Sequence, residues 1–210
     1  MRHQASRSLA LVALIACGCA HTIRVETPPP AAPAPARTAG PPVAIDSVAV
    51  RNADGPLNVS DELLLQVANR LRRSGLFATV YEPAVSHEAP PEVLRLTLDL
   101  RHTDHPEPMS TGMLKALLVF ATVHLLAPAL PYRYGYEADL DATFAGPRRW
   151  ERSYHSHAEG SVRYPLTFSD PYRAGVETRS AVIDRALELM LHTIASDPEF
   201  VSGPAPSASR

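Results

Sequence analysis

The sequence is poor in cysteine. Its only two cysteines, Cys17 and Cys19, lie near the start of a chain of 210 residues. A disulfide within the rest of the chain is therefore excluded, although small exported domains often depend on disulfides. Hydrophobic residues make up 45% of the sequence, which is sufficient for a core that forms by burial alone.

The sequence also lacks a dominant charge and the common catalytic motifs. The formal net charge is −2, and there is no basic stripe or polybasic patch, which argues against a nucleic-acid partner. Neither a phosphate-binding glycine loop nor a nucleophile elbow occurs. These absences predict a protein that is not an enzyme.

No apolar run reaches the ~20 residues that a membrane-spanning helix needs. The first run, residues 9–16, follows a segment that contains Arg2 and Arg7 and no acidic residue. A basic segment, a short apolar run and small residues before a cleavage point are typical of an export signal. The run ends in the residues Leu14-Ile15-Ala16-Cys17.

That ending resembles the lipobox of bacterial lipoproteins. The resemblance implies that a signal peptide, residues 1–16, is removed and that Cys17 carries a covalent lipid, the only cofactor expected. Cys19 remains an alternative because cleavage before it would leave no spare thiol, whereas Leu14, three residues before Cys17, favours Cys17. The other alternative is an ordinary secreted protein with two incidental cysteines.

Neither cysteine is followed by the aspartate that keeps similar lipoproteins in the inner membrane. The resemblance therefore implies a lipid anchor in the outer membrane, facing the periplasm.

Proline and alanine dominate the residues that follow the predicted lipid. Residues 17–42 are predicted to form an extended tether, because such a composition favours polyproline II and offers little to a core. Residues 43–200 have the size and composition of a single periplasmic domain. Residues 201–210, rich in serine, alanine and proline, are predicted to be a flexible tail.

Within the domain, the hydrophobic period changes between that of strands and that of helices. Leucines alternate with polar residues over 92–102, and a similar alternation over 132–144 predicts a second strand. Ser60, followed by two acidic residues, predicts the start of an amphipathic helix that Gly75 would end. The other predicted elements are strands over 43–51, 76–81 and 150–157 and a helix from about 171 to 196. We therefore predict an α+β fold: a small, mainly antiparallel sheet of about five strands, two amphipathic helices on one face, and an inserted, strongly hydrophobic helix.

A helix ending in Arg73-Ser-Gly-Leu-Phe-Ala-Thr-Val80 and leading into a strand pair resembles small envelope lipoprotein domains. These include the outer-membrane activators of peptidoglycan synthases, the curli-secretion lipoprotein and the N-terminal domain of the Tol-system propeller protein. The resemblance implies assembly or partner binding rather than catalysis. We therefore expect a lipid-anchored accessory or assembly factor of the cell envelope. Its expected partners are the membrane that holds the lipid and an envelope protein or a second copy of the chain.

The inserted helix is predicted over residues 113–127, after Ser110-Thr111-Gly112 as a cap and before Pro128. It is apolar on nearly all sides, so it must be buried or contact lipid. At 1.5 Å per residue it reaches only about 22 Å, which is short of a ~30 Å hydrocarbon core. A core helix, a membrane-dipping helix and a subunit interface remain as alternatives. The predicted membrane or partner contacts are Leu114, Leu117, Leu118, Phe120 and Leu125.

Four histidines form the one grouping that is typical of a metal site. His102 and His105 end one predicted strand, and His155 and His157 alternate on another. If the strands form a meander, these ends lie at one edge of the sheet, about 10 Å apart. The alternative function is therefore a metal-binding protein or a metal-dependent hydrolase. The simpler interpretation is that these are solvated surface histidines and that no metal is bound.

Overall fold

The computed structural model describes residues 21–31, 40–83, 88–122, 126, 129–164 and 171–202. The chain divides into two compact units. The first unit comprises residues 1–26, 104–136 and 159–181, and the second comprises residues 27–103, 137–158 and 182–210.

The α+β class is confirmed, but the sheet is larger and more mixed than predicted. Seven strands form it, in the order β1-β7-β6-β5-β2-β3, with β4 paired to β2. β2 runs parallel to β5 and to β4, whereas β1 and β3 pair antiparallel. The prediction of a mainly antiparallel sheet missed these two parallel pairings, because alternation shows which face a residue occupies, not which strand lies beside it. The strands are β1 (Thr22–Val25), β2 (Val43–Asn52), β3 (Gly55–Leu57), β4 (Val80–Tyr81), β5 (Leu94–Pro106), β6 (Tyr132–Ala145) and β7 (Glu151–Tyr164).

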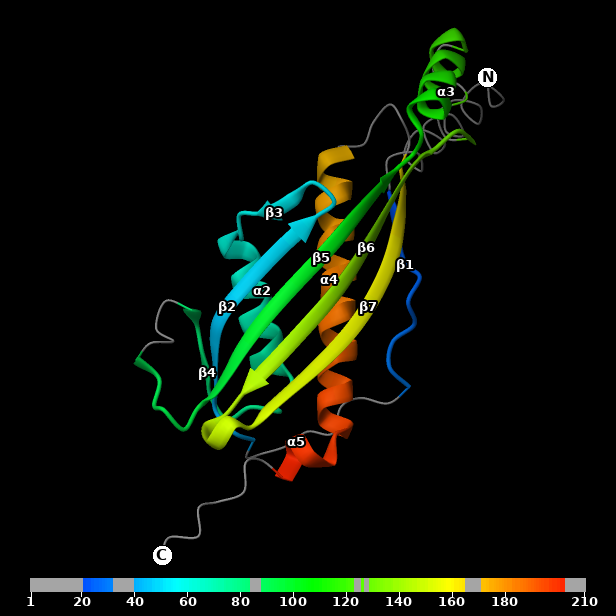
Figure 1. Ribbon diagram of the computed structural model, residues 1–210. Helices are drawn as coiled ribbons and strands as arrows, with labels where there is room; N and C mark the ends of the chain where they lie inside the picture. Colours follow the sequence, from blue (N-terminus) through cyan, green and yellow to red (C-terminus); the bar gives the residue numbers. More distant parts are fainter. Residues whose placement is uncertain are drawn as a thin grey trace, which may run out of the picture. The chain divides into compact units, whose positions relative to one another are not determined.

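The second unit contains the larger part of the core. On β5 the alternating leucines 94, 96, 98 and 100 are at most 2% exposed. Helix α2 (Asp61–Arg73) and the later turns of α4 (Pro171–Ser196) lie on the same face of the strands (Figure 1). Ser156 of β7 donates a hydrogen bond of 2.9 Å to the Ala186 carbonyl of α4, which fixes the helix on the strands. The short helix α5 (Pro198–Ser202) adds Phe200 to an aromatic group with Phe77 and Phe144.

Helix α2 begins and ends as predicted. The Ser60 side chain accepts a hydrogen bond from the Leu63 amide at 3.2 Å, so it caps the helix. Gly75 follows the helix with φ of 68°, a left-handed conformation that favours glycine. The predicted strand over 76–81 is reduced to the two residues of β4.

In the first unit, part of the predicted tether belongs to the sheet. Residues 22–25 form β1 and pair antiparallel with β7, with Thr22 opposite Arg163. Ile23 packs against the cluster of Val162, Tyr164 and Ala174. The composition of residues 17–42 concealed this strand because it is only four residues long and is followed by prolines.

A polar cluster holds the first turns of α4 against the strands of the first unit. The Arg179 guanidinium lies 3.0 Å from a carboxylate oxygen of Asp104 and donates a hydrogen bond of 2.9 Å to the Tyr134 hydroxyl. Tyr134 in turn donates to Asp104. Burial, and then the bond to Asp104, raise the pKa of Tyr134 to about 12. The Tyr134 hydroxyl therefore stays protonated across the neutral range.

Candidate functional site

The inserted helix, α3 (Met109–Ala121), begins four residues earlier than predicted. Pro108 occupies the cap position, and no side chain makes a capping hydrogen bond. The Gly112 amide already donates to the Pro108 carbonyl at 3.0 Å, so the predicted cap residues lie within the first helical turn. The helical period of the leucines correctly identified the helix but did not indicate its first residue.

One narrow side of α3 packs against the first unit. Val119 is 3% exposed and is the only buried residue of the helix. A Cβ atom on Gly112 would lie 3.2 Å from the Tyr132 ring, so the helix backbone passes close to that side chain. The Lys115 ammonium donates to the Pro131 carbonyl at 2.9 Å. These three positions lie within about 60° of one another around the helix axis.

Most of the rest of α3 is apolar and exposed. Phe120 is 77% exposed and Leu117 is 60% exposed, although both side chains are of the kind that proteins usually bury. At 100° per residue, the large exposed side chains cover an arc of about 180° around the helix. We name this surface the apolar arc of α3; its members are Met109, Met113, Leu114, Leu117, Leu118 and Phe120. The interpretation of this helix as core is therefore wrong for its described residues.

The one cation of α3 is neutralised within the first unit. Lys115 forms an ion pair of 2.5 Å with Glu107, which also accepts a hydrogen bond from the Arg133 amide at 3.1 Å. Burial opposes the charge on Glu107, but the contacts with Lys115 and Arg133 outweigh it and hold the pKa of Glu107 below its usual value. The helix thus presents mostly apolar atoms outward and keeps its only charge paired on its packed side.

Not all the predicted contact residues can be placed. Leu114, Leu117, Leu118 and Phe120 belong to the apolar arc of α3, whereas Leu125 lies outside the described residues. Both candidates for acylation, Cys17 and Cys19, also lie outside them. The described chain begins at His21, directly before β1. None of the helices that the structure describes has the length and apolar character needed to cross a membrane.

The histidines do not form a metal site. β5, β6 and β7 are neighbours in the predicted order, but His102 lies on the same face of β5 as the buried leucines. His155 and His157 are exposed on the opposite face, where they pair with Asp141 at 2.8 Å and Asp139 at 2.9 Å. In the described part of the chain, no three histidine, cysteine or acidic side chains are placed to hold a metal ion. A metal site was kept as an alternative because the faces of the two strands could not be related from sequence.

His155 and His157 lie on a charged surface of the second unit. No described helix covers this face of the second unit, and its side chains form a series of ion pairs. The pairs join Asp46 to Arg95, Asp99 to Arg51 and Asp141 to Arg101, at 2.8–3.1 Å. The polar positions that alternate with leucines on β5 were the available signal. The side chains of these pairs are in contact with solvent, and ion pairs of this kind contribute little to stability.

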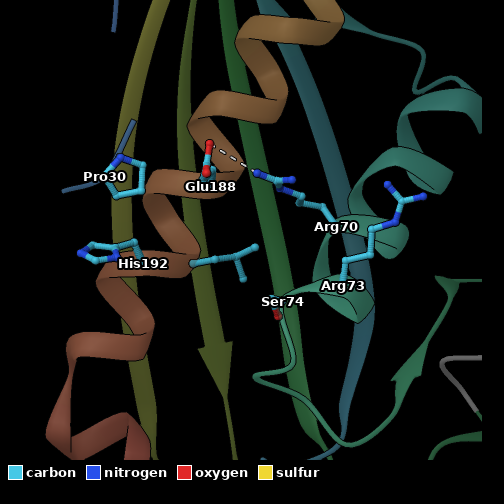
Figure 2. A pocket seen from close by; sticks show the side chains of 7 residues that line it. Pro30, Arg70, Arg73, Ser74, Glu188 and His192 are labelled. Atoms are coloured by element: carbon cyan, nitrogen blue, oxygen red, sulfur yellow. Dashed lines mark ion pairs between the residues drawn. The ribbon is translucent and has the colours of Figure 1, made fainter. Parts of the chain in front are cut away.

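Figure 2 shows a pocket of about 210 Å³ in the second unit, which is smaller than the ~300 Å³ at which ligand pockets usually begin. Arg70 and Glu188 form an ion pair of 3.4 Å across it. The Ser74 hydroxyl donates to the Leu71 carbonyl at 2.6 Å and accepts from the Leu76 amide, so it supports the end of α2 and is not activated as a nucleophile. The lining residues are Pro30, Arg70, Arg73, Ser74, Glu188, Leu191 and His192. This arrangement supplies neither a nucleophile with a base nor a set of metal ligands.

No protein-family model matches the chain, and no curated protein matches it. Among solved structures, it is similar to a minor lipoprotein from Acinetobacter baumannii, with 8% identity and a TM-score of 0.36 over 73% of this chain and 87% of that one. It is also similar to a PelC dodecamer from Paraburkholderia phytofirmans, with 16% identity and a TM-score of 0.35 over 82% of this chain and 96% of that one. Rare lipoprotein B from Shewanella oneidensis has 14% identity and a TM-score of 0.30 over 70% of this chain and 86% of that one. Similarities with such low TM-scores carry no argument about function.

Proposed function

We propose that this chain is a lipid-anchored protein of the bacterial cell envelope, located at the outer membrane on its periplasmic side. It acts as a non-enzymatic accessory or assembly factor, through contact with other molecules. The observation that carries the proposal is the apolar arc of α3, because exposed apolar surface of this kind marks contact with a membrane or a protein.

The predicted export signal and lipid support the same proposal. An acylated Cys17 or Cys19 would precede β1 by only a few residues, and β1 belongs to the same unit as α3. The lipid would thus keep the unit that contains α3 close to a bilayer, where both a membrane and membrane-bound proteins are within reach.

The competing function, metal-dependent hydrolysis, has weaker support. His155 and His157 are paired with aspartates on a solvated sheet face, and His102 lies on the other face. The described pocket contains no catalytic group in a usable geometry.

A complementation experiment separates the two functions. A strain of the source bacterium that lacks this gene would receive the wild-type chain, Leu114→Asp with Leu118→Asp, or His155→Ala with His157→Ala. We expect the variant with two aspartates not to reverse the defect caused by loss of the gene. The variant that lacks His155 and His157 should reverse it. Leu65→Asp is the matched control, because Leu65 is an equally exposed leucine on α2. The opposite result, with failure of the histidine variant alone, would favour the hydrolase.

A further inference from the structure

We propose that the apolar arc of α3 inserts into the bilayer leaflet that holds the acyl chains, so that the protein has a second membrane contact besides its lipid. This inference rests on the proposed function only in that acylation brings the chain to a membrane. It selects the bilayer, rather than a protein, as the occupant of the arc.

The width of the arc favours lipid over a second copy of the chain. The large apolar side chains cover about 180° of the helix surface, and the packed side occupies only about 60°. A helix that packs on one partner buries a stripe of roughly 100°. A single docked partner would therefore leave exposed leucine or phenylalanine on at least one side, whereas acyl chains surround a helix and would cover the whole arc.

Direct contacts connect the base of α3 to the strand that follows the predicted lipid. Gly112 of α3 lies against the Tyr132 ring, and Tyr132 packs on Tyr164 with their ring centroids 5.3 Å apart. Tyr164 ends β7, and its neighbour Arg163 is paired with Thr22, the first residue of β1. The start of β1 and the base of α3 are therefore at the same end of the first unit.

The length of chain between lipid and sheet restricts how far this end can move from the bilayer. Cys17 precedes Thr22 by five residues and Cys19 precedes it by three. Fully extended, these segments reach at most about 18 Å and about 11 Å. α3 itself, at 13 residues, is about 20 Å long, so it can enter the leaflet without crossing the bilayer.

The charge distribution of α3 is compatible with insertion. An unpaired cation in the hydrocarbon region is costly, but Lys115 is paired with Glu107 on the packed side of the helix. The Tyr132 hydroxyl donates to the Glu107 carbonyl at 3.3 Å beside this pair. Tyrosine is enriched at membrane–water interfaces, so the packed side of α3 has the chemistry of the headgroup level and the apolar arc has that of the acyl level.

The test uses tryptophan as a probe of depth in the acylated full-length protein. Trp150→Phe removes the only native tryptophan, and Leu117→Trp then places one in the apolar arc. The protein is reconstituted in vesicles of phosphatidylethanolamine and phosphatidylglycerol with bromine atoms in the acyl chains, which quench tryptophan on contact. Leu65→Trp, in the same background, is the matched control on an exposed leucine of α2.

We expect the Leu117→Trp emission to shift to the blue and to lose most of its intensity in brominated vesicles, while the control keeps a water-like, unquenched emission. A water-like emission from Leu117→Trp would overturn the inference, and so would a blue-shifted emission that bromine does not quench, because the probe would then face protein.

Mass spectrometry of the purified chain tests acylation separately. An acylated chain without quenching refutes the insertion and leaves the anchor intact. An unacylated chain refutes the anchor, and the insertion is then decided by quenching of that chain at saturating vesicle concentration.

Discussion

Single side chains contribute to the stability of this fold mainly through burial, because the only two cysteines lie before the core and no disulfide supplements it. Leu98 of β5 is fully buried, with 0% exposure, between the strands and the helices of the second unit. We expect Leu98→Ala to lower the free energy of unfolding by about 2–5 kcal/mol, through lost transfer energy and the cavity that remains. Urea unfolding followed by circular dichroism measures this difference.

Leu65 provides the comparison for that measurement, since it is 50% exposed on α2. Leu65→Ala should change the free energy of unfolding by no more than about 0.5 kcal/mol. Equal effects of the two substitutions would show that the β5 leucines do not form the core.

The tyrosines predict a loss of stability in alkaline solution. Burial raises the pKa of Tyr134 and of Tyr164 to about 12, from an ordinary value of 10.0. Above about pH 10 the unfolded chain releases these protons before the folded chain does, so stability should fall as the pH rises from about 10 towards 12 and should not depend on them below about 10. Urea midpoints measured across this range test the prediction.

Tyr134→Phe tests how much Tyr134 contributes to this alkaline loss of stability. The variant loses the hydrogen bonds to Asp104 and Arg179 and is expected to be less stable at neutral pH, yet its stability should fall less steeply above about pH 10. An unchanged slope would mean that Tyr134 does not contribute to the alkaline transition.

Among the secondary-structure elements, β1 permits a test at the resolution of one residue. The Glu26 amide donates to the Glu159 carbonyl at 2.9 Å, and bonded pairs alternate along an antiparallel ladder, so Arg24 and Ser161 form the next bonded pair. Arg24→Pro removes one of its donors, whereas Val25→Pro alters an amide that points away from β7. We expect faster hydrogen exchange at the Ser161 amide in Arg24→Pro and not in Val25→Pro. Equal exchange in both variants would contradict the observed register.

Elements with strong local signals were predictable from sequence. Ser60, Gly75 and the leucine alternation each reflect interactions within one element, and α2 and β5 were found close to the predicted positions. Four members of the apolar arc, Leu114, Leu117, Leu118 and Phe120, were also identified as an unusual surface, whereas Met109 and Met113 were not among the predicted contacts.

Relations between distant elements were not predictable from a single sequence. The parallel pairing of β2 with β5, the addition of β1 to β7 and the opposite faces of His102 and His155 all depend on which strands become neighbours. The ion pair between Lys115 and Glu107 likewise depends on how α3 folds back towards the end of β5. Local propensity contains no information on these contacts, because each of them is formed by tertiary packing.

For the molecule as a whole, the proposed acylation has two candidate cysteines, Cys17 and Cys19. We expect radioactive palmitate to label the wild-type chain and Cys19→Ser but not Cys17→Ser, because Leu14 is placed for cleavage before Cys17. Labelled protein is detected by autoradiography of membrane fractions.

Two outcomes would contradict this assignment. Label that is kept by Cys17→Ser and lost from Cys19→Ser would move the lipid to Cys19. Label that survives when both cysteines are replaced would contradict acylation at either position, because no other cysteine is present.

The position of β1 also determines the order in which the molecule can be completed. β1 is the first described strand of the chain, yet the Glu26 side chain that follows it binds Ser161, 135 residues later. Contacts at such separation form late, because the intervening chain must first be brought together. If the chain is exported and acylated as proposed, its N-terminal end would therefore be at the membrane before the docking strand for β1 exists. Until then the edge of β7 is an open template for any extended segment, including β1 of a neighbouring copy. At high surface density, exchange of this strand between copies is consequently the misassembly to which the molecule is most exposed.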